Sequence, residues 1–277
     1  MKRATFLGWA AIVTMMLGTA APAPATVITY TTPPGSTQDS LPVSVSATFT
    51  TGTDWLQIVV NNFQVNPTSV TQNLSALDFV ISTGQTGVGV GGGLTSSSGT
   101  SRTVDTAGKG SSDNPFTDNG TVSTGWGLRE GLSLPFGLGT GFALCLICPS
   151  GGTQVSAPTA NPENTIIGGS DGSNFYSNAN GSIAGNDAHN PFLFGPVTFN
   201  LTIAGLTSDS TIAGVVFSFG TTAGNDTQGC EGSCSTTTTQ VPTPPSAMLI
   251  GLGVVVAGAA VARSRWRNTR RIGAPVA

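Results

Sequence analysis

Apolar and polar residues alternate along several short segments of this chain. Residues 43–50 read Val, Ser, Val, Ser, Ala, Thr, Phe, Thr, and residues 197–203 carry Val, Phe, Leu and Ile at every second position. Leu56, Ile58 and Val60 form a third alternating set. A period of two is typical of a β-strand that buries one face. These three segments therefore predict half-buried strands.

Other apolar runs are short and uninterrupted. Residues 77–81 and 212–219 are rich in Val, Ile and Phe, which favour the pleated surface of a sheet. Residues 132–146 form an apolar island that predicts one or two more strands. Turn-forming residues separate these runs, and no helical period is found between them. The pattern favours an all-β class, an antiparallel β-sandwich that is jelly-roll-like.

Long polar stretches separate the early strands from the late ones. Residues 83–128 and 149–190 are rich in Gly, Ser, Thr and Asn. Loops of this length without structure are uncommon in a compact domain. They predict either short strands with a weak pattern or long Gly/Ser-rich loops that decorate the sandwich. Pairing of early with late strands would make residues 26–220 a single domain.

The composition narrows the class of protein further. Only 8% of the 277 residues are charged, and Gly and Pro number 38 and 17, which excludes coiled coils and long helical bundles. Residues 26–240 hold three basic residues (Arg102, Lys109 and Arg129) against all 13 acidic ones, a net charge of −10. An acidic, sparsely charged body argues against nucleic acid as a partner.

The first 25 residues have the three parts of a secretory signal. Lys2 and Arg3 are followed by the apolar segment 6–17, and Ala23 and Ala25 place small residues at −3 and −1 of a cleavage site. We expect a signal peptide over 1–25, with Ala20 as a second cleavage position. An uncleaved N-terminal anchor is the alternative.

The C-terminal residues predict a membrane segment. Residues 247–262 form an apolar run of sixteen residues, about 24 Å long as a helix. A cluster of arginines follows, which favours a cytoplasmic end and stops transfer: Arg263, Arg265, Arg267, Arg270 and Arg271. A buried core helix is the alternative. Residues 221–240 are Thr/Gly/Ser-rich and predict a spacer, and 272–277 form a short tail.

The motif before this apolar run is Val241-Pro242-Thr243-Pro244. Together with the helix and the arginines, segment 241–271 resembles the PEP-CTERM sorting signal of exported Gram-negative proteins, although Thr243 stands where that family usually has Glu. The resemblance implies recognition by an exosortase-like processing enzyme, an inner-membrane-anchored precursor and a mature form at the cell surface or in the extracellular matrix. It also implies an association with exopolysaccharide.

The four cysteines form two close pairs, Cys145 with Cys148 and Cys230 with Cys234. In an exported protein an even number of cysteines favours disulfides. Local pairing is the simplest of the three connectivities, and cross-pairing would join the apolar island to the spacer. Four thiolates around zinc or redox-active thiols are the alternatives.

Two glycine motifs resemble parts of enzyme sites. Gly87, Gly89 and Gly92 match G-x-G-x-x-G, and 168–172 match G-x-S-x-G with His189, the one histidine, downstream. Both chemistries need a helix after the motif, and neither segment predicts one. We therefore expect no catalytic residues, no metal and no cofactor.

Three aspartates in Gly/Asn-rich loops have two interpretations. Asp171, Asp187 and Asp226 suit turns, and their carboxylates are also the oxygen ligands that calcium prefers.

The leading hypothesis is a non-enzymatic structural or interaction protein at the cell surface. A carbohydrate-binding module for exopolysaccharide is the alternative, with four candidate aromatic residues: Trp55, Trp126, Phe175 and Tyr176. Trp55 could instead belong to the core of its strand. A second alternative is an extracellular acid/base hydrolase, which would require two carboxylates to converge in a cleft.

Overall fold

The structure, a computed structural model, describes residues 25–107 and 113–231. Every strand pair in these ranges is antiparallel, and the one helical element within them is the 3-10 turn η1 (Val70–Gln72). The predicted all-β, antiparallel class is therefore confirmed. The predicted signal cleavage region up to residue 24, the sorting motif, the transmembrane helix and the arginine cluster lie outside the described residues.

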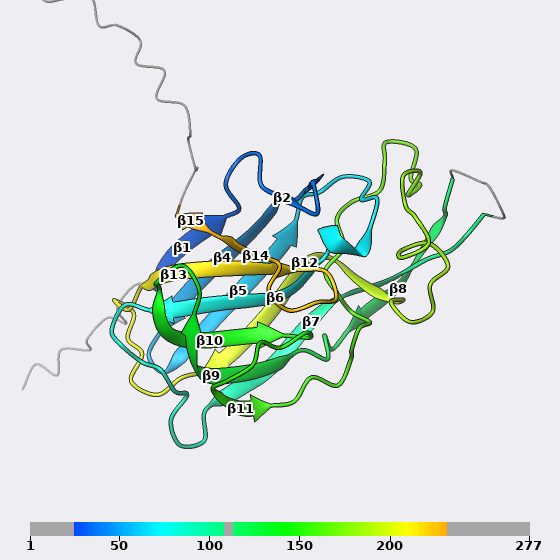
Figure 1. Cartoon of the computed structure of the whole chain (residues 1–277). Helices are drawn as coiled ribbons and strands as arrows, with labels where there is room; N and C mark the ends of the chain where they lie inside the picture. The colour runs from blue at the N-terminus through cyan, green and yellow to red at the C-terminus, as the bar shows by residue number, and fades with distance from the viewer. Residues whose placement is uncertain (1–24, 108–112, 232–277) are drawn as a thin grey trace, which may run out of the picture. The chain divides into compact units, whose positions relative to one another are not determined.

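Two sheets stack face to face (Figure 1). The first has the order β15-β1-β4-β5-β12-β7-β8. Its strands are β1 (Thr26–Thr31), β4 (Val45–Gly52), β5 (Trp55–Asn62), β7 (Gly93–Val104), β8 (Phe116–Val122), β12 (Phe192–Thr202) and β15 (Cys230–Glu231).

The second sheet has the order β11-β9-β10-β6-β13-β14. Its strands are β6 (Leu74–Ile81), β9 (Gly127–Leu134), β10 (Gly139–Cys145), β11 (Thr153–Ser156), β13 (Ile212–Phe219) and β14 (Asp226–Gln228). A small hairpin of β2 (Thr37–Gln38) and β3 (Leu41–Pro42) completes the fold.

The main core lies between the two sheets and follows the predicted alternation. Leu56, Ile58 and Val60 of β5 are fully buried, as are the inward residues of β12. Rings from opposite sheets meet in this layer: Phe49 and Phe79 have centroids 5.6 Å apart. Burial of each such side chain contributes roughly 1.5–3 kcal/mol relative to exposure, so the alternating faces supply much of the driving force for stacking.

Early and late segments pair directly, as the single-domain hypothesis requires. β5 pairs with β12, and β6 pairs with β13. The described body is thus one sandwich, with strands from both ends of the sequence at the centre of each sheet.

The polar stretches contain more strand than their pattern indicates. Residues 83–128 hold β7 and β8, and β11 lies within 149–190. β7 lacks a clear period because Ser, Thr and Gly occupy both of its faces. The segment 157–191 forms loops beside the β7–β8 hairpin (Figure 1) and has its own apolar cluster, in which Tyr176 and Ile183 pack with Val104 and Phe192.

The predicted spacer boundary at residue 221 is wrong. β14 pairs with β13, and β15 pairs with β1 at the edge of the first sheet. These short strands are held by backbone hydrogen bonds, which need no apolar side chains, so the Thr/Gly-rich composition concealed them. Among the described residues, no helix has the length and the apolar composition that a membrane span requires.

Candidate functional site

The outer face of the seven-stranded sheet carries a wide surface of mainly uncharged polar side chains, with Val27 and Val59 among them. We call this the polar face and define it by two rows: Thr50, Gln57, Asn200 and Ser96, and Thr29, Thr48, Val59, Thr198 and Ser98. Gln57 Nε2 donates to Asn200 Oδ1 at 3.0 Å, and Asn200 Nδ2 donates to Ser96 Oγ at 3.0 Å. Side chains are thus connected across three neighbouring strands, which orders the surface.

Trp55 lies at one end of the polar face. Its side chain is 42% exposed, so the alternative that it belongs to the core is wrong. A Cβ atom at Gly52 would lie 2.1 Å from the indole Nε1, which places the indole directly over the glycine in the neighbouring strand. Because Gly52 has no side chain, the ring lies close to the sheet with part of its surface open to solvent.

The other aromatic candidates are not available to a ligand in this way. Trp126 is 3% exposed, packs against Phe199 and donates from its indole nitrogen to the Asn164 carbonyl. Tyr176 is fully buried and Phe175 is half-buried. Of the four predicted aromatic residues, Trp55 therefore remains as the exposed ligand-binding candidate.

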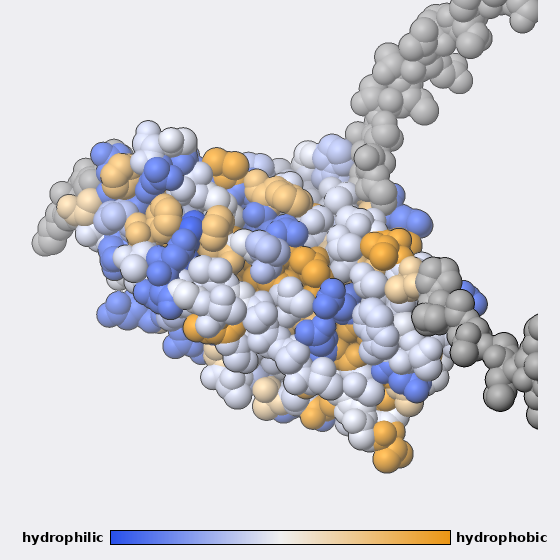
Figure 2. All heavy atoms as spheres, turned by 180° about the vertical axis from the view of Figure 1, so that it is seen from behind, coloured by the Kyte–Doolittle hydropathy of each residue, from blue (hydrophilic) through white to orange (hydrophobic). Residues whose placement is uncertain are grey.

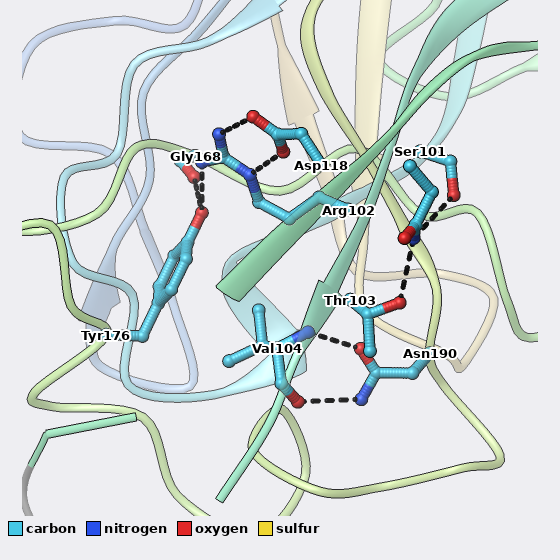
Figure 3. A network of polar contacts seen from close by, with 9 residues as sticks. Ser101, Arg102, Thr103, Val104, Asp118, Gly168, Tyr176 and Asn190 are labelled. Carbon is cyan, nitrogen blue, oxygen red and sulfur yellow. Dashed lines mark hydrogen bonds and ion pairs between the residues drawn. The ribbon is translucent and has the colours of Figure 1, made fainter. Parts of the chain in front are cut away.

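A second polar site joins β7, β8 and the 157–191 segment around Arg102 (Figure 3). Arg102 is buried, and its Nε and Nη2 donate to the two carboxylate oxygens of Asp118 at 2.6 and 2.8 Å. Nη1 donates to the Tyr176 hydroxyl at 3.1 Å, and that hydroxyl donates to the Gly168 carbonyl at 2.7 Å. The guanidinium carbon lies 3.4 Å from the ring centroid of Phe194.

These contacts keep Arg102 charged. Burial lowers its pKa, but the hydrogen bonds to Asp118 and Tyr176 outweigh this effect and raise the pKa above the ordinary value. Burial also raises the pKa of Tyr176. The guanidinium donates two hydrogen bonds to Asp118 of β8 and one to Tyr176 of the 157–191 segment, so the network anchors this segment to the sheet.

A small pocket lies on the outer face of the six-stranded sheet. It is lined by Asp78 of β6, Asp226 of β14, the β9 end at Leu132–Leu134, the loop at Ile147 and Pro149, and the turn Thr222–Gly224. Its volume is about 50 Å³. The two carboxylates that the hydrolase hypothesis required to converge therefore do so here, but in a space much smaller than the roughly 300–1,000 Å³ of ordinary small-molecule sites.

Asp78 is the most perturbed acid among the described residues. Burial, with a further effect from the charge of Asp226, raises the pKa of Asp78 to about 7. Its Oδ1 is buried without a hydrogen-bond partner in the described part of the chain. Asp226, in contrast, has a hydrogen-bond partner: its Oδ1 accepts a hydrogen bond from the Ser218 hydroxyl.

The local cysteine pairing is confirmed for the first pair. Cys145 and Cys148 form a disulfide at the end of β10, beside the pocket-lining residues Ile147 and Pro149. This excludes cross-pairing and a zinc site made of all four cysteines. Cys230 is also disulfide-bonded, and its predicted partner Cys234 lies outside the described residues.

Loss of the Cys145–Cys148 bridge is expected to destabilise the protein by about 2 kcal/mol, the loop-closure entropy of so short a ring. The test is urea unfolding of the oxidised protein against the Cys145→Ala/Cys148→Ala variant. Alanine suits the fully buried site at Cys145. Equal unfolding midpoints for the two proteins would contradict a stabilising role.

The glycine motifs have structural roles. Residues 87–92 form a turn that enters strand β7, and no helix follows the G-x-S-x-G segment. The His189 ring nitrogen Nδ1 contacts the Ser182 carbonyl at 2.6 Å, within the loop. Neither enzyme motif therefore has the strand–turn–helix context that its chemistry needs.

The three candidate aspartates differ in their surroundings. Asp171 accepts hydrogen bonds from the backbone of Ser173 and Phe175 and from the Ser177 hydroxyl, which lower its pKa, so it is a turn residue. Asp187 is exposed. Asp226 lines the pocket described above, together with Asp78.

Neither Asp78 nor Arg102 was predicted from the sequence to be a site residue. Each has a local signal, since a single carboxylate interrupts the apolar run Leu-Asp-Phe-Val-Ile and a single arginine interrupts a Ser/Thr-rich strand. Buried ionisable residues of this kind are rare and usually paired.

Comparisons of this chain with protein-family models, with curated proteins and with solved structures found no match.

Proposed function

We propose that this chain is an exported, non-enzymatic protein whose sandwich acts as a structural or interaction module at the cell surface or in the extracellular matrix. The observation that carries the proposal is the polar face, a broad sheet surface that consists, apart from Val59, of uncharged Ser, Thr, Asn and Gln side chains. Figure 2 shows one side of the molecule, on which residues of intermediate hydropathy predominate and apolar groups are small and separate. Such a surface suits hydrated, weakly charged partners.

Targeting is the second half of the proposal. Segment 1–25 directs export, and segment 241–271 directs sorting. The helix 247–262, which follows the jelly-roll-like body, holds the precursor in the inner membrane. An exosortase-like enzyme processes the tail at the Val241–Pro244 motif. This half rests on the sequence pattern and on the resemblance of the tail to PEP-CTERM signals.

Fractionation of cells tests the targeting. We expect the full chain in the membrane or surface fraction and a chain ending at Gln240 in the soluble exported fraction, because the shortened chain lacks the apolar run. Mass spectrometry of both ends of the mature protein locates the cleavage sites. A full-length product found entirely in the cytoplasm contradicts the proposal.

Carbohydrate binding is the second candidate, favoured by the exposed indole of Trp55 beside the amides of Gln57 and Asn200. Sugars present C–H faces that stack on aromatic rings, and side-chain amides hydrogen-bond to hydroxyl groups. The ring and the ordered amide row beside it supply both kinds of contact on the same face of the sheet.

Replacing Trp55 is expected to weaken binding of the producer's exopolysaccharide at least tenfold, because tryptophans are enriched among the contact residues whose truncation costs more than ~1.4 kcal/mol. The matched control is Phe136→Ala, which removes an exposed aromatic residue from the β9–β10 turn of the other sheet. Affinity electrophoresis in gels that contain the polysaccharide measures both variants. Equal retardation of Trp55→Ala and the wild type would remove this candidate.

A further inference from the structure

The pocket on the six-stranded sheet contains a buried acid with no compensating contact. Asp78 is 3% exposed, and its Oδ1 is buried without a hydrogen-bond partner among the described residues. An unpaired buried carboxylate is costly in free energy. Native proteins rarely keep such a group unless a water, a proton or an ion completes it.

A second carboxylate increases the free-energy cost of burying an ionised Asp78. Asp226 lines the same pocket and interacts electrostatically with Asp78. Ser218 is the one hydroxyl hydrogen-bonded to this pair of acids in the described residues. Two like charges at one cavity repel each other, so the ionised pair needs a positive charge between or beside the two groups.

The described residues supply no positive charge that pairs with Asp78 or Asp226. The one ion pair in residues 25–107 and 113–231 joins Arg102 to Asp118, on the other sheet. Arg129 of β9 lies in register with Asp78 across Ala143 of β10, but its Nη2 donates to the Gly151 carbonyl and no ion pair joins it to Asp78. The pair of acids is therefore without a protein counter-ion in this part of the chain.

Besides the two acids, the polar side chains that line the pocket carry hydroxyl groups: Ser75, Ser133, Ser218 and Thr222. No His or Cys is among the described residues that line the pocket, and these are the ligands that zinc prefers. Two carboxylates with hydroxyl, carbonyl and water oxygens form the ligand type that calcium takes, with six to eight oxygens in a flexible arrangement.

We propose that this pocket is a calcium site, in which Asp78 and Asp226 bind the ion and the surrounding hydroxyl and carbonyl oxygens with water complete its coordination. The pocket volume of about 50 Å³ accommodates an ion with a small number of waters. With two carboxylates the affinity belongs to the range of extracellular modules, roughly 10⁻⁴ to 10⁻³ M. The proposal goes beyond the surface function and does not depend on it.

Thermal unfolding of the full chain in detergent tests the site. The protein is treated with chelator, dialysed and measured at pH 8 with 0–10 mM CaCl₂ at constant ionic strength. We expect Tm to rise by several degrees in a saturable manner, because a ligand that binds only the folded state stabilises it. MgCl₂ at the same concentrations should give a smaller rise, since Mg²⁺ demands stricter octahedral geometry.

Three variants locate the effect. Asp78→Asn and Asp226→Asn should abolish the calcium-dependent rise, and Asp78→Asn should also raise Tm in chelator by removing the repulsion. Asp187→Asn, which neutralises an exposed aspartate in a distant loop, should keep the full response. If one pocket variant does not fold, the other still decides the question. No calcium-dependent rise in the wild type, or an unchanged rise in the folded pocket variants, would overturn the proposal.

Discussion

Replacing Arg102 with methionine is expected to lower the free energy of unfolding by about 2–3 kcal/mol, because the hydrogen bonds of a buried charge are lost while the remaining Asp118, which is 41% exposed, stays partly solvated. The guanidinium makes two hydrogen bonds to Asp118 and one to Tyr176, and it lies against the rings of Phe116 and Phe194. Methionine retains part of the apolar stem but leaves the buried Tyr176 hydroxyl without this partner. Urea unfolding measures the loss.

Arg129→Met is the matched control. Arg129 is half-buried and donates one hydrogen bond, to the Gly151 carbonyl, so its loss should cost less than about 1 kcal/mol. The double variant Arg102→Met/Asp118→Asn should recover part of the loss, because Asp118 is no longer an unpaired charge. Its side chain is 41% exposed, which limits that recovery. Equal effects of the two single arginine variants would show that the network around Arg102 is not an anchor.

The second large effect is a fall in stability as pH rises. Burial and the charge of Asp226 raise the pKa of Asp78 from 3.8 to about 7. Between these values the folded state holds a proton that the unfolded state has lost, so the folded state is favoured at the acidic end of this window. The free energy of unfolding should fall by on the order of 4 kcal/mol between pH 4 and pH 8 in chelator, and it should level off above the folded pKa.

The groups that face Asp78 support this assignment. On the neighbouring strands it lies opposite Ala143 of β10 and Val216 of β13, so Asp226 of β14 is the charged group with a resolved effect on its pKa. Asp78→Asn should remove the dependence between pH 4 and pH 8, whereas Asp187→Asn should retain it. Urea unfolding at intervals of half a pH unit measures the slope. A slope of the same size in Asp78→Asn would assign the effect to another group.

Much of the fold was predictable from local pattern. The inward faces of β5 and β12 and the central strands β6 and β13 correspond to the alternating and apolar segments of the sequence. Among the strands that were missed, β7 and β14 have Ser, Thr, Gly, Asp or Gln at most positions in place of an apolar face. Their backbones are paired all the same, and backbone pairing leaves little trace in composition.

The candidate sites were less predictable, because their members are distant in sequence. Trp55 was identified as an aromatic candidate, but the position of its ring close to the sheet depends on the absence of a side chain at Gly52 on the neighbouring strand. Asp226 was singled out as a possible calcium ligand, but its companion Asp78 reads as one residue of an apolar strand.

The sequence alone determined the class of structure, because the period of two follows from the pleat of a single strand and needs no knowledge of its neighbours. It also determined the acidic balance of the body, since charge is a property of composition. Only the tertiary structure decided which side chains meet. Strand register places Asp226 on the same outer face as Asp78, through β13 between them, and places Arg102 opposite Asp118. That register depends on pairing between distant segments, which local pattern does not encode.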